Sequence, residues 1–235
     1  MVNNCVNIIQ NLLYPATCIL CGAPGFSNLD ICSHCHRELP ANPNCCKRCA
    51  APIAASADHN EICGACIVNP PLFDQCIAPF LYQTPINNLI GSFKFQQKLS
   101  HGRLLSLLLM DFLERIQPQM PDVIMPVPLH GKRLTERGFN QALEIARPIS
   151  KHFRLPLDHA SCVRWHATKP QMTLQKRSRL RNIKGAFKIL GNINVSHVVL
   201  LDDVVTTGST VSELAALLKK RGAERVDVWA LARTP

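Results

Sequence analysis

The chain has 235 residues, 47% of them hydrophobic, which is enough to bury one well-packed domain plus a smaller one and excludes a disordered protein. Its longest apolar run, near Leu104–Met110, is far shorter than the ~20 residues of a transmembrane helix, so we expect no membrane span. With 26 Lys and Arg against 16 Asp and Glu, the net charge of +10 favours polyanionic ligands: nucleic acid, phosphorylated metabolites or an acidic membrane surface.

The N-terminal residues predict a short amphipathic helix over 6–14, which Pro15 ends. They carry neither a basic leader nor the long apolar core of a secretory signal, so we expect a cytoplasmic protein. In such a reducing compartment, twelve cysteines favour metal binding over a disulfide framework.

Four CxxC motifs follow within residues 18–66. Each motif places two thiolates on one side of a tight turn, and two such turns supply the four sulfur ligands that tetrahedral zinc prefers. We predict one or two structural zinc ions rather than a catalytic one, because four thiolates leave no coordination position for water. The predicted ligands are Cys18, Cys21, Cys32, Cys35, Cys46, Cys49, Cys63 and Cys66.

The pairing of these motifs is open, because the spacing alone allows two arrangements. A sequential arrangement, in which the first two motifs form one site and the last two another, is favoured over an interleaved one. A nearby histidine could also replace a cysteine ligand; the candidates are His34, His36 and His59. Outside the motifs lie Cys5, Cys45, Cys76 and Cys162, of which Cys76 and Cys162 are expected to be small buried apolar residues.

After Pro70-Pro71 cysteines become rare and hydrophobic patterns of helix and strand length appear. We therefore predict a zinc-ribbon domain over 1–70 and a second domain over 71–235. Strands alternate with helices in this second part, which predicts an α/β fold with a parallel sheet. The expected strands cover 76–83, 122–127, 198–201 and 226–231, and the expected helices cover 85–95, 102–116, 140–152 and 211–221.

The segment 198–213 carries the clearest chemical signal. A buried strand would deliver Asp202 and Asp203 at its carboxyl end, where open α/β sheets bind ligands. The following loop, Thr206–Thr210, contains hydroxyls and Gly208 and leads into a helix, as a phosphate-binding turn does. The acidic pair suits two ribose hydroxyls and a Mg²⁺ contact. Alone, each feature could be a solvated turn or an ordinary helix cap, and the missing GK[ST] excludes a P-loop.

A basic segment precedes this loop, with eight Lys and Arg from Arg164 to Lys188 and no Asp or Glu between Asp158 and Asp202. It is open to interpretation as a solvated helix, as a nucleic-acid patch or as a cover over the anion site. Trp165 offers a stacking platform for a base, although a lone Trp is more often part of a core. A second aromatic and basic spot, at residues 93–95, is of weak specificity.

Three sequence blocks together resemble a known family. VVLLDDVVTTGST at 198–210 resembles the PRPP-binding signature of type I phosphoribosyltransferases. PVPLHGKRLTERGFNQA at 126–142, KPQMTLQKRSRLRNIKGAF at 169–187 and the CxxC motifs extend the likeness to the ComF family (ComFC/GntX-like). The resemblance covers Leu12 to Thr234. It implies a double zinc ribbon followed by a parallel-sheet, type I phosphoribosyltransferase-like domain. It further implies a cytosolic role with incoming single-stranded DNA in natural transformation, beside a helicase-like competence protein.

The resemblance also assigns roles to residues that match the family's blocks. Asp202 and Asp203 would be catalytic and would hold the ribose of PRPP with Mg²⁺. Arg133 and Arg137, together with Asn140, would lie near pyrophosphate, and basic residues of 169–184 would close over the site. Forked guanidinium donors suit pyrophosphate oxygens and would stabilise its departure. The expected PRPP-binding residues are Asp202, Asp203, Val204, Thr206, Thr207, Gly208, Ser209, Thr210, Arg133, Arg137, Lys176 and Arg177.

These observations support two kinds of function. The favoured one is a competence-associated protein that uses a PRPP/Mg²⁺-binding site while it handles single-stranded DNA. The alternative is an active phosphoribosyltransferase that acts on a nucleobase or a small-molecule acceptor, although no acceptor-recognition motif stands out between residues 70 and 120. A purely structural zinc adaptor is disfavoured, because a scaffold does not need the DDVVTTGST segment.

Overall fold

A parallel β-sheet forms the centre of the protein in the computed structural model, which describes residues 15–27, 29–54, 62–166, 183–191 and 193–235. The strand order is β1-β7-β6-β3, and β2 also pairs with β7. All pairings in this sheet are parallel, which confirms the α/β class expected from the sequence. The strands are β1 (Cys76–Ile77), β2 (Phe80–Leu81), β3 (Val123–Pro126), β6 (His197–Val205) and β7 (Arg225–Arg233).

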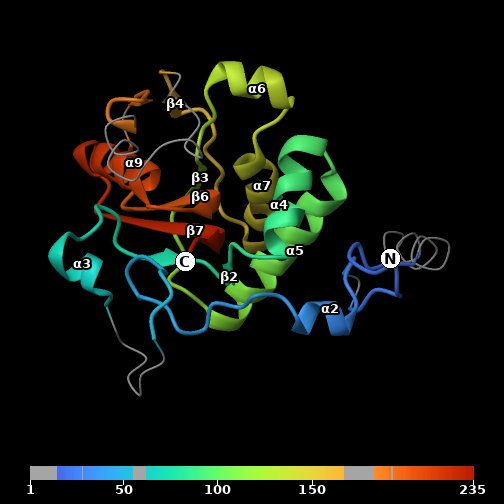
Figure 1. Cartoon of the computed structure of the whole chain (residues 1–235). Helices are drawn as coiled ribbons and strands as arrows, with labels where there is room; N and C mark the ends of the chain where they lie inside the picture. The colour runs from blue at the N-terminus through green and yellow to red at the C-terminus, as the bar shows by residue number, and fades with distance from the viewer. Residues whose placement is uncertain (1–14, 28, 55–61, 167–182, 192) are drawn as a thin grey trace.

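Helices cover both faces of this sheet (Figure 1). The helices α4, α5 and α7 pack on one face, and α9 packs on the other with a two-stranded antiparallel sheet of β4 and β5. Their bounds are α4 Ile86–Gln96, α5 Leu99–Ile116, α7 Gln141–Phe153, α9 Ser209–Lys220, β4 Cys162–Arg164 and β5 Phe187–Ile189. The sequence predicted the long helices and strands but not β4, β5 or the short helix α6 (Gly131–Arg137).

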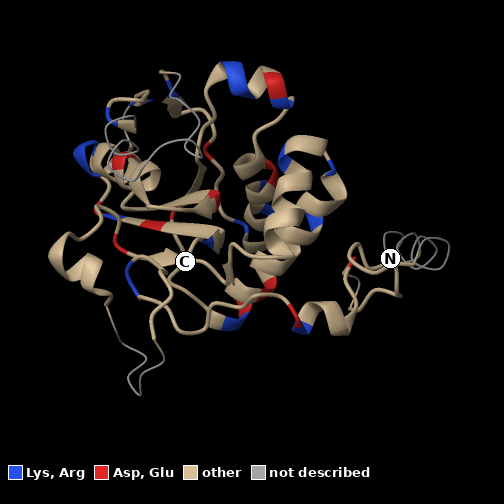
Figure 2. Cartoon of the chain, in the orientation of Figure 1, with Lys and Arg blue, Asp and Glu red and all other residues tan. Residues whose placement is uncertain are grey.

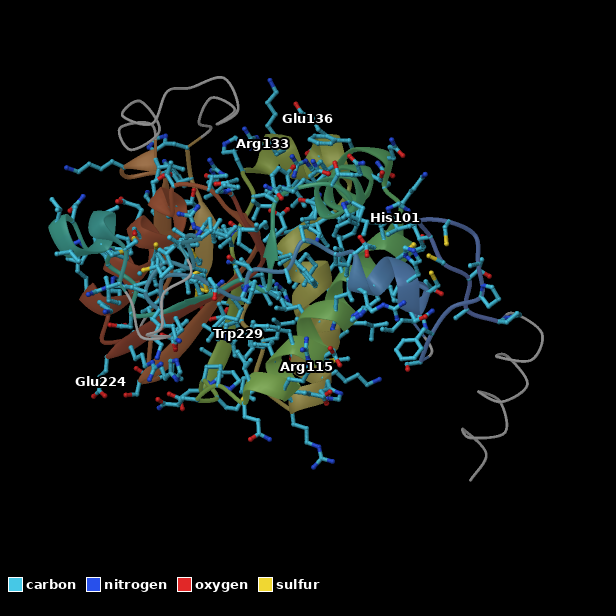
Figure 3. All side chains as sticks on the ribbon, turned by 60° about the horizontal axis from the view of Figure 1, so that its bottom comes forward. His101, Arg115, Arg133, Glu136, Glu224 and Trp229 are labelled. Carbon is cyan, nitrogen blue, oxygen red and sulfur yellow. The ribbon has the colours of Figure 1, made fainter. Side chains whose placement is uncertain are left out.

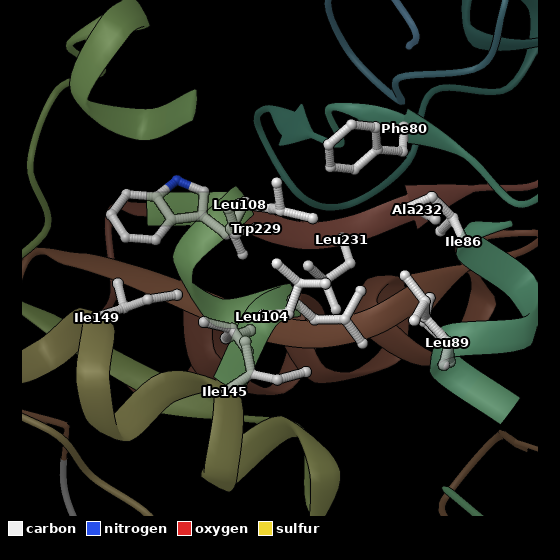
Figure 4. Close-up of a cluster of buried hydrophobic side chains, with 14 of the residues drawn as sticks. Phe80, Ile86, Leu89, Leu104, Leu108, Ile145, Ile149, Trp229, Leu231 and Ala232 are labelled. Carbon is white, nitrogen blue, oxygen red and sulfur yellow. The ribbon is translucent and has the colours of Figure 1, made fainter. Parts of the chain in front are cut away.

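The central strands alternate between two hydrophobic cores because successive side chains of a strand point to opposite faces. Leu201 and Trp229 point toward the helical face, and Leu200 and Val228 point toward α9. Figure 4 shows Trp229 among Leu104 and Leu108 of α5 and Ile145 and Ile149 of α7, and Trp229 is only 1% exposed. Burial of such a side chain contributes roughly 1.5–3 kcal/mol or more to folding.

Two strands differ from their predicted bounds. The strand predicted at 76–83 is interrupted, because Pro79 has no N–H to continue the ladder on β7, and the Ala78 carbonyl accepts from Asn42 Nδ2 at 3.2 Å. The strand predicted at 198–201 continues to Val205, so the acidic pair lies within β6 rather than after it. Pairing with β7 through Val205↔Arg233 explains this extension.

The N-terminal cysteine region divides into two parts that lie on different sides of the sheet. Figure 1 shows their short helices, α2 (Ser33–Arg37) and α3 (Gly64–Val68), on opposite sides of the molecule. Ile31 and Leu39 pack into the core of the helical face, whereas Ala50 packs into the other core beside Phe73. The predicted boundary between 1–70 and 71–235 stays a prediction. The predicted helix 6–14, Cys5 and His59 lie outside the described residues.

None of the described helices combines the length and the apolar character that crossing a bilayer requires.

Candidate functional site

Two clusters of four cysteines have the geometry of zinc sites. Within each cluster, the Sγ atoms all lie within 4.8 Å of one another. Zinc–sulfur bonds of ~2.3 Å in a tetrahedron separate the sulfurs by about 3.8 Å. Cys21 and Cys32 match this with an Sγ–Sγ distance of 3.7 Å, as do Cys49 and Cys63. The residues therefore fit structural zinc. The first cluster is Cys18, Cys21, Cys32 and Cys35, and the second is Cys46, Cys49, Cys63 and Cys66.

This grouping confirms the sequential pairing that the sequence favoured. Neither His34 nor His36 belongs to a cluster. Burial opposes ionisation of the Cys46 thiol, but three backbone N–H groups, including that of Cys63 at 3.3 Å, lower its pKa to about 7. Cys76 and Cys162 are buried as expected, and burial raises the pKa of Cys162 to about 12, so this thiol stays protonated.

Asp202 and Asp203 lie near the carboxyl end of β6 in different environments. Asp203 is 7% exposed, and its Oδ2 pairs with Lys94 Nζ from α4 at 2.7 Å. Asp202 accepts a hydrogen bond from the Asp203 N–H at 2.8 Å. Burial, followed by the neighbouring charge of Asp203, raises the pKa of Asp202 to about 7. Asp202 is therefore partly protonated at neutral pH.

The loop after β6 has the form that the sequence predicted. Gly208 has φ 74°, a left-handed conformation that favours glycine, and it is the N-cap of α9. Thr207 Oγ1 and Ser209 Oγ lie 2.7 Å apart, and the Ser209 N–H points to Thr207 Oγ1 at 3.4 Å. The loop therefore leads from the end of β6, which carries the acidic pair, to the first N–H groups of the 12-residue helix α9, where the helix dipole favours an anion.

A cavity of about 550 Å³ opens over this edge of the sheet. It brings together seven predicted site residues from β6, its loop and α6: Arg133, Arg137, Asp202, Asp203, Val204, Thr206 and Thr210. Thr207, Gly208 and Ser209 belong to the loop but do not line the cavity. Lys176 and Arg177 lie outside the described residues. Figure 3 shows Arg133 and Glu136 at one end of the molecule, opposite Glu224 and Arg115.

The predicted arginine and asparagine residues are held by local contacts. Arg137 lies over the Phe95 ring, with its Cζ 5.3 Å from the ring centroid, and donates to Gln141 Oε1 at 2.8 Å. Asn140 caps α7 by accepting from the Ala142 N–H, and its Nδ2 donates to the Val127 carbonyl at 3.1 Å. Both polar groups of Asn140 therefore already serve the fold, so it shapes the wall of the cavity.

Three further cavity residues were not assigned to the site from the sequence: Lys94, Arg164 and Tyr82. Lys94 stood out only as part of the aromatic and basic spot at 93–95, and Arg164 only as the first residue of the basic segment. Arg164 also lies over Phe187, with its Cζ 5.5 Å from the ring centroid. Figure 2 shows Lys and Arg on α6 and beside β4, near this edge. No sequence signal marked Tyr82.

A second cavity of about 520 Å³ adjoins the first. The two share a wall made of Pro128, Leu129, Asn140 and Arg164. The second cavity continues between α6, α7 and β4, where its wall combines apolar side chains, such as Leu134 and Phe139, with the charged Glu144 and Arg147.

Comparison with known proteins identifies both parts of the chain. The double zinc ribbon domain matches residues 9–67, and the phosphoribosyl transferase domain matches residues 140–235. DNA utilization protein YhgH of Escherichia coli is 37% identical over 229 residues, which cover 95% of this chain and 99% of that protein. Competence protein F of Haemophilus influenzae is 34% identical over 92% of this chain and 96% of its own length. Competence protein ComFC of Bacillus subtilis is 27% identical over 87% and 84%.

Proposed function

This chain belongs to the family of DNA utilization protein YhgH and competence proteins F and ComFC, and we propose that it binds PRPP with Mg²⁺ while it handles incoming DNA. The observation that carries the proposal is one cavity that joins the acidic pair, the two end residues of the phosphate loop (Thr206 and Thr210), and the α6 arginines Arg133 and Arg137. The chain has the zinc-ribbon and phosphoribosyltransferase-like domains in sequence.

The residues around the cavity suit the parts of a phosphorylated pentose. Asp202 and Asp203 would accept hydrogen bonds from the two ribose hydroxyls, and the N–H groups at the start of α9 would hold the 5′-phosphate. Arg133 and Arg137 would bind the pyrophosphate with forked donors. Asp202 and Asp203 would also hold a magnesium ion, which would neutralise the negative charge of the ligand.

Lys94 must compete with this ligand. Its ammonium occupies the Oδ2 of Asp203 with both side chains mostly buried, at 18% and 10% exposure. A ribose hydroxyl or a cation that binds Asp203 displaces this contact or shares the carboxylate. The released ammonium of Lys94 would then lie beside the ligand's phosphates and could pair with them, because they are anionic like Asp203.

We place single-stranded DNA on the basic surface that flanks β4 and β5. Trp165 is 57% exposed, and Lys188 Nζ lies 3.8 Å from its ring centroid, so an aromatic face and a cation are combined at the surface. Such pairs bind bases by stacking and phosphates by charge. The helicase-like partner and the cytoplasmic location are part of this proposal. None of the described cysteines forms a disulfide, which agrees with a reducing compartment.

An active phosphoribosyltransferase is the second candidate. The observation that favours it is the adjoining cavity of about 520 Å³, which has room for an acceptor beside the proposed sugar site. Turnover separates the two functions. Release of pyrophosphate from PRPP and Mg²⁺ only when a nucleobase is added would establish the enzyme. PRPP binding without any release supports the DNA-handling protein.

The direct test is calorimetric titration with PRPP and Mg²⁺. Replacing Asp203 by Asn keeps the shape of the side chain but removes a charged acceptor worth about 1.5–3 kcal/mol, so we expect affinity to fall ~10- to 150-fold. Zinc content should not change. Asp111→Asn, an equal charge change at a side chain 52% exposed on α5, is the matched control and should bind as the wild type does. Absence of binding to the folded wild type refutes the proposal.

A further inference from the structure

Arg233, at the end of β7, connects the second cysteine cluster to the phosphate loop. Its Nε donates to the carbonyl of Cys49 at 2.9 Å. Its Nη1 donates to the carbonyls of Val205, at 3.2 Å, and of Thr206. The same nitrogen reaches Thr234, whose own N–H donates to the Val205 carbonyl at 3.1 Å. One guanidinium thus spans a zinc-ligand backbone and the first residue of the proposed phosphate loop.

Apolar contacts also connect the second cysteine cluster to the phosphate loop. Ala50, which follows Cys49, is fully buried and shares a core cluster with Phe73. Phe73 in turn lies against the phosphate loop, because a Cβ on Gly208 would be 3.5 Å from its ring. On the other side, Asn42 Nδ2 donates to the Ala50 carbonyl at 3.0 Å. The turn that follows Cys49 therefore packs, through the core around Phe73, against the phosphate loop at Gly208.

The turn itself is conformationally demanding. Ala50 has φ 55°, a left-handed conformation that costs a non-glycine residue energy, and its N–H donates to the Cys46 carbonyl at 2.8 Å. The equivalent position of the first cluster is Gly22, with φ 78°. Metal binding to Cys46 and Cys49 is the contact that would hold the second turn in this shape. Loss of the metal would therefore let the Cys49 carbonyl turn away from Arg233.

The first cluster lies elsewhere in the molecule. Cys18 and Ile31 pack into the core of the helical face, together with residues of α4 and α5. Figure 1 shows α2, which carries Cys35, on the side of the molecule away from α3 and α9. The two clusters are alike in chemistry but only the second contacts Arg233, so the chain contains its own comparison site.

We propose that Arg233 is a positioning residue through which zinc at the second cluster holds the phosphate loop in its binding geometry. Zinc at this cluster and the phosphoribosyl ligand therefore strengthen each other's binding, and the first cluster does not take part. The inference rests on the function proposed above. Coupled binding is reciprocal: if bound zinc raises the affinity for the ligand by some factor, bound ligand raises the affinity for zinc by the same factor. Typical factors are ~5- to 150-fold.

The test compares four full-length variants for zinc content by native mass spectrometry and for PRPP–Mg²⁺ affinity by calorimetry. Cys63→Ser, in the second cluster, should weaken PRPP binding ~10-fold, whereas Cys21→Ser, in the first, should change it less than ~2-fold. Arg233→Gln keeps all cysteine ligands and should weaken PRPP binding as Cys63→Ser does. The double variant Cys63→Ser/Arg233→Gln should be no weaker than either single variant, because both break one connection.

A second measurement needs no ligand. Hydrogen exchange of the backbone amides at 206–210 should quicken in Cys63→Ser and Arg233→Gln but not in Cys21→Ser. Equal effects of Cys21→Ser and Cys63→Ser, or wild-type exchange in Arg233→Gln, would overturn the inference. If the wild type binds no PRPP, the proposed function fails, and the exchange data still decide whether the second cluster orders the loop.

Discussion

Replacing Asp202 by Asn is expected to stabilise the protein at neutral pH while it removes the proposed ligand site. The wild-type carboxyl has its pKa raised from 3.8 to about 7 by burial and by Asp203. Asn keeps the shape and an Oδ1 that can accept from the Asp203 N–H, which lies 2.8 Å away. The variant therefore removes a carboxylate that the fold holds at a cost, with little change in packing.

The direction in which stability changes with pH follows from proton binding. Between about pH 4 and pH 7, unfolded Asp202 is ionised while the folded form keeps its proton, so wild-type stability falls as pH rises through this window. Above about pH 7 the wild type has lost all of this stability, and below about pH 4 Asp202 no longer lowers the free energy of unfolding. The difference between 3.8 and about 7 corresponds to ~4 kcal/mol at most, at 1.36 kcal/mol per pKa unit. Because Asp202 is partly exposed, we expect ~1–2 kcal/mol.

Urea unfolding of the two proteins between pH 4.5 and pH 8 measures this effect. The free energies of unfolding should agree near the acid end and diverge with rising pH, with the variant more stable by ~1–2 kcal/mol, or ~2–8 °C in Tm, at pH 8. Asp111→Asn, at an exposed site, should follow the wild type throughout. Parallel curves for wild type and Asp202→Asn would refute the raised pKa and the electrostatic reasoning built on it.

Three other changes test separate parts of the structure. Gly208→Ala has room for its Cβ but disfavours the left-handed φ of 74° by ~1–2 kcal/mol. The free loop should relax to another conformation, and restoring the binding geometry then weakens PRPP binding by ~5- to 30-fold in calorimetry, with unchanged zinc. Asp227→Ala removes a buried carboxylate that contacts His197 and Arg225 at the amino edge of the sheet and leaves their donors without it; urea unfolding should show a loss of ~1–3 kcal/mol with PRPP affinity unchanged. Trp165→Ala should weaken oligothymidine binding by ~1–3 kcal/mol in fluorescence titrations, and affinity should fall with rising salt. A wild-type result in any of these would remove the corresponding role.

The features that the sequence predicted are those whose signal is local. Cysteine pairs three residues apart marked both thiol clusters, and a continuous apolar run followed by two acids and a hydroxyl-rich turn marked β6 and its loop. Helix and strand bounds were correct to within a few residues where periodicity was strong. They failed at Pro79, where one missing N–H divides a strand, and at Val205, where pairing with β7 lengthens one.

The features that were missed depend on contacts between distant parts of the chain. Lys94 meets Asp203 because α4 packs beside the end of β6, and nothing in the sequence near Lys94 names its partner. Arg233 and Cys49 are 184 positions apart, so the connection between cluster and loop follows only from the folded arrangement. Asn140, expected near pyrophosphate by resemblance, lines the cavity with Arg133 and Arg137, but its cap on α7 and its bond to the Val127 carbonyl could be seen only in the fold.

A crystal structure of the protein soaked with PRPP and Mg²⁺ tests the central claim most directly. We predict density for the ribose beside Asp202 and Asp203, the 5′-phosphate on the amides of 206–210, and the pyrophosphate toward Arg133 and Arg137. Lys94 should leave Asp203 in that structure. An empty cavity in a well-ordered crystal at saturating PRPP, or a phosphate bound only at the basic surface near Trp165, would contradict the account.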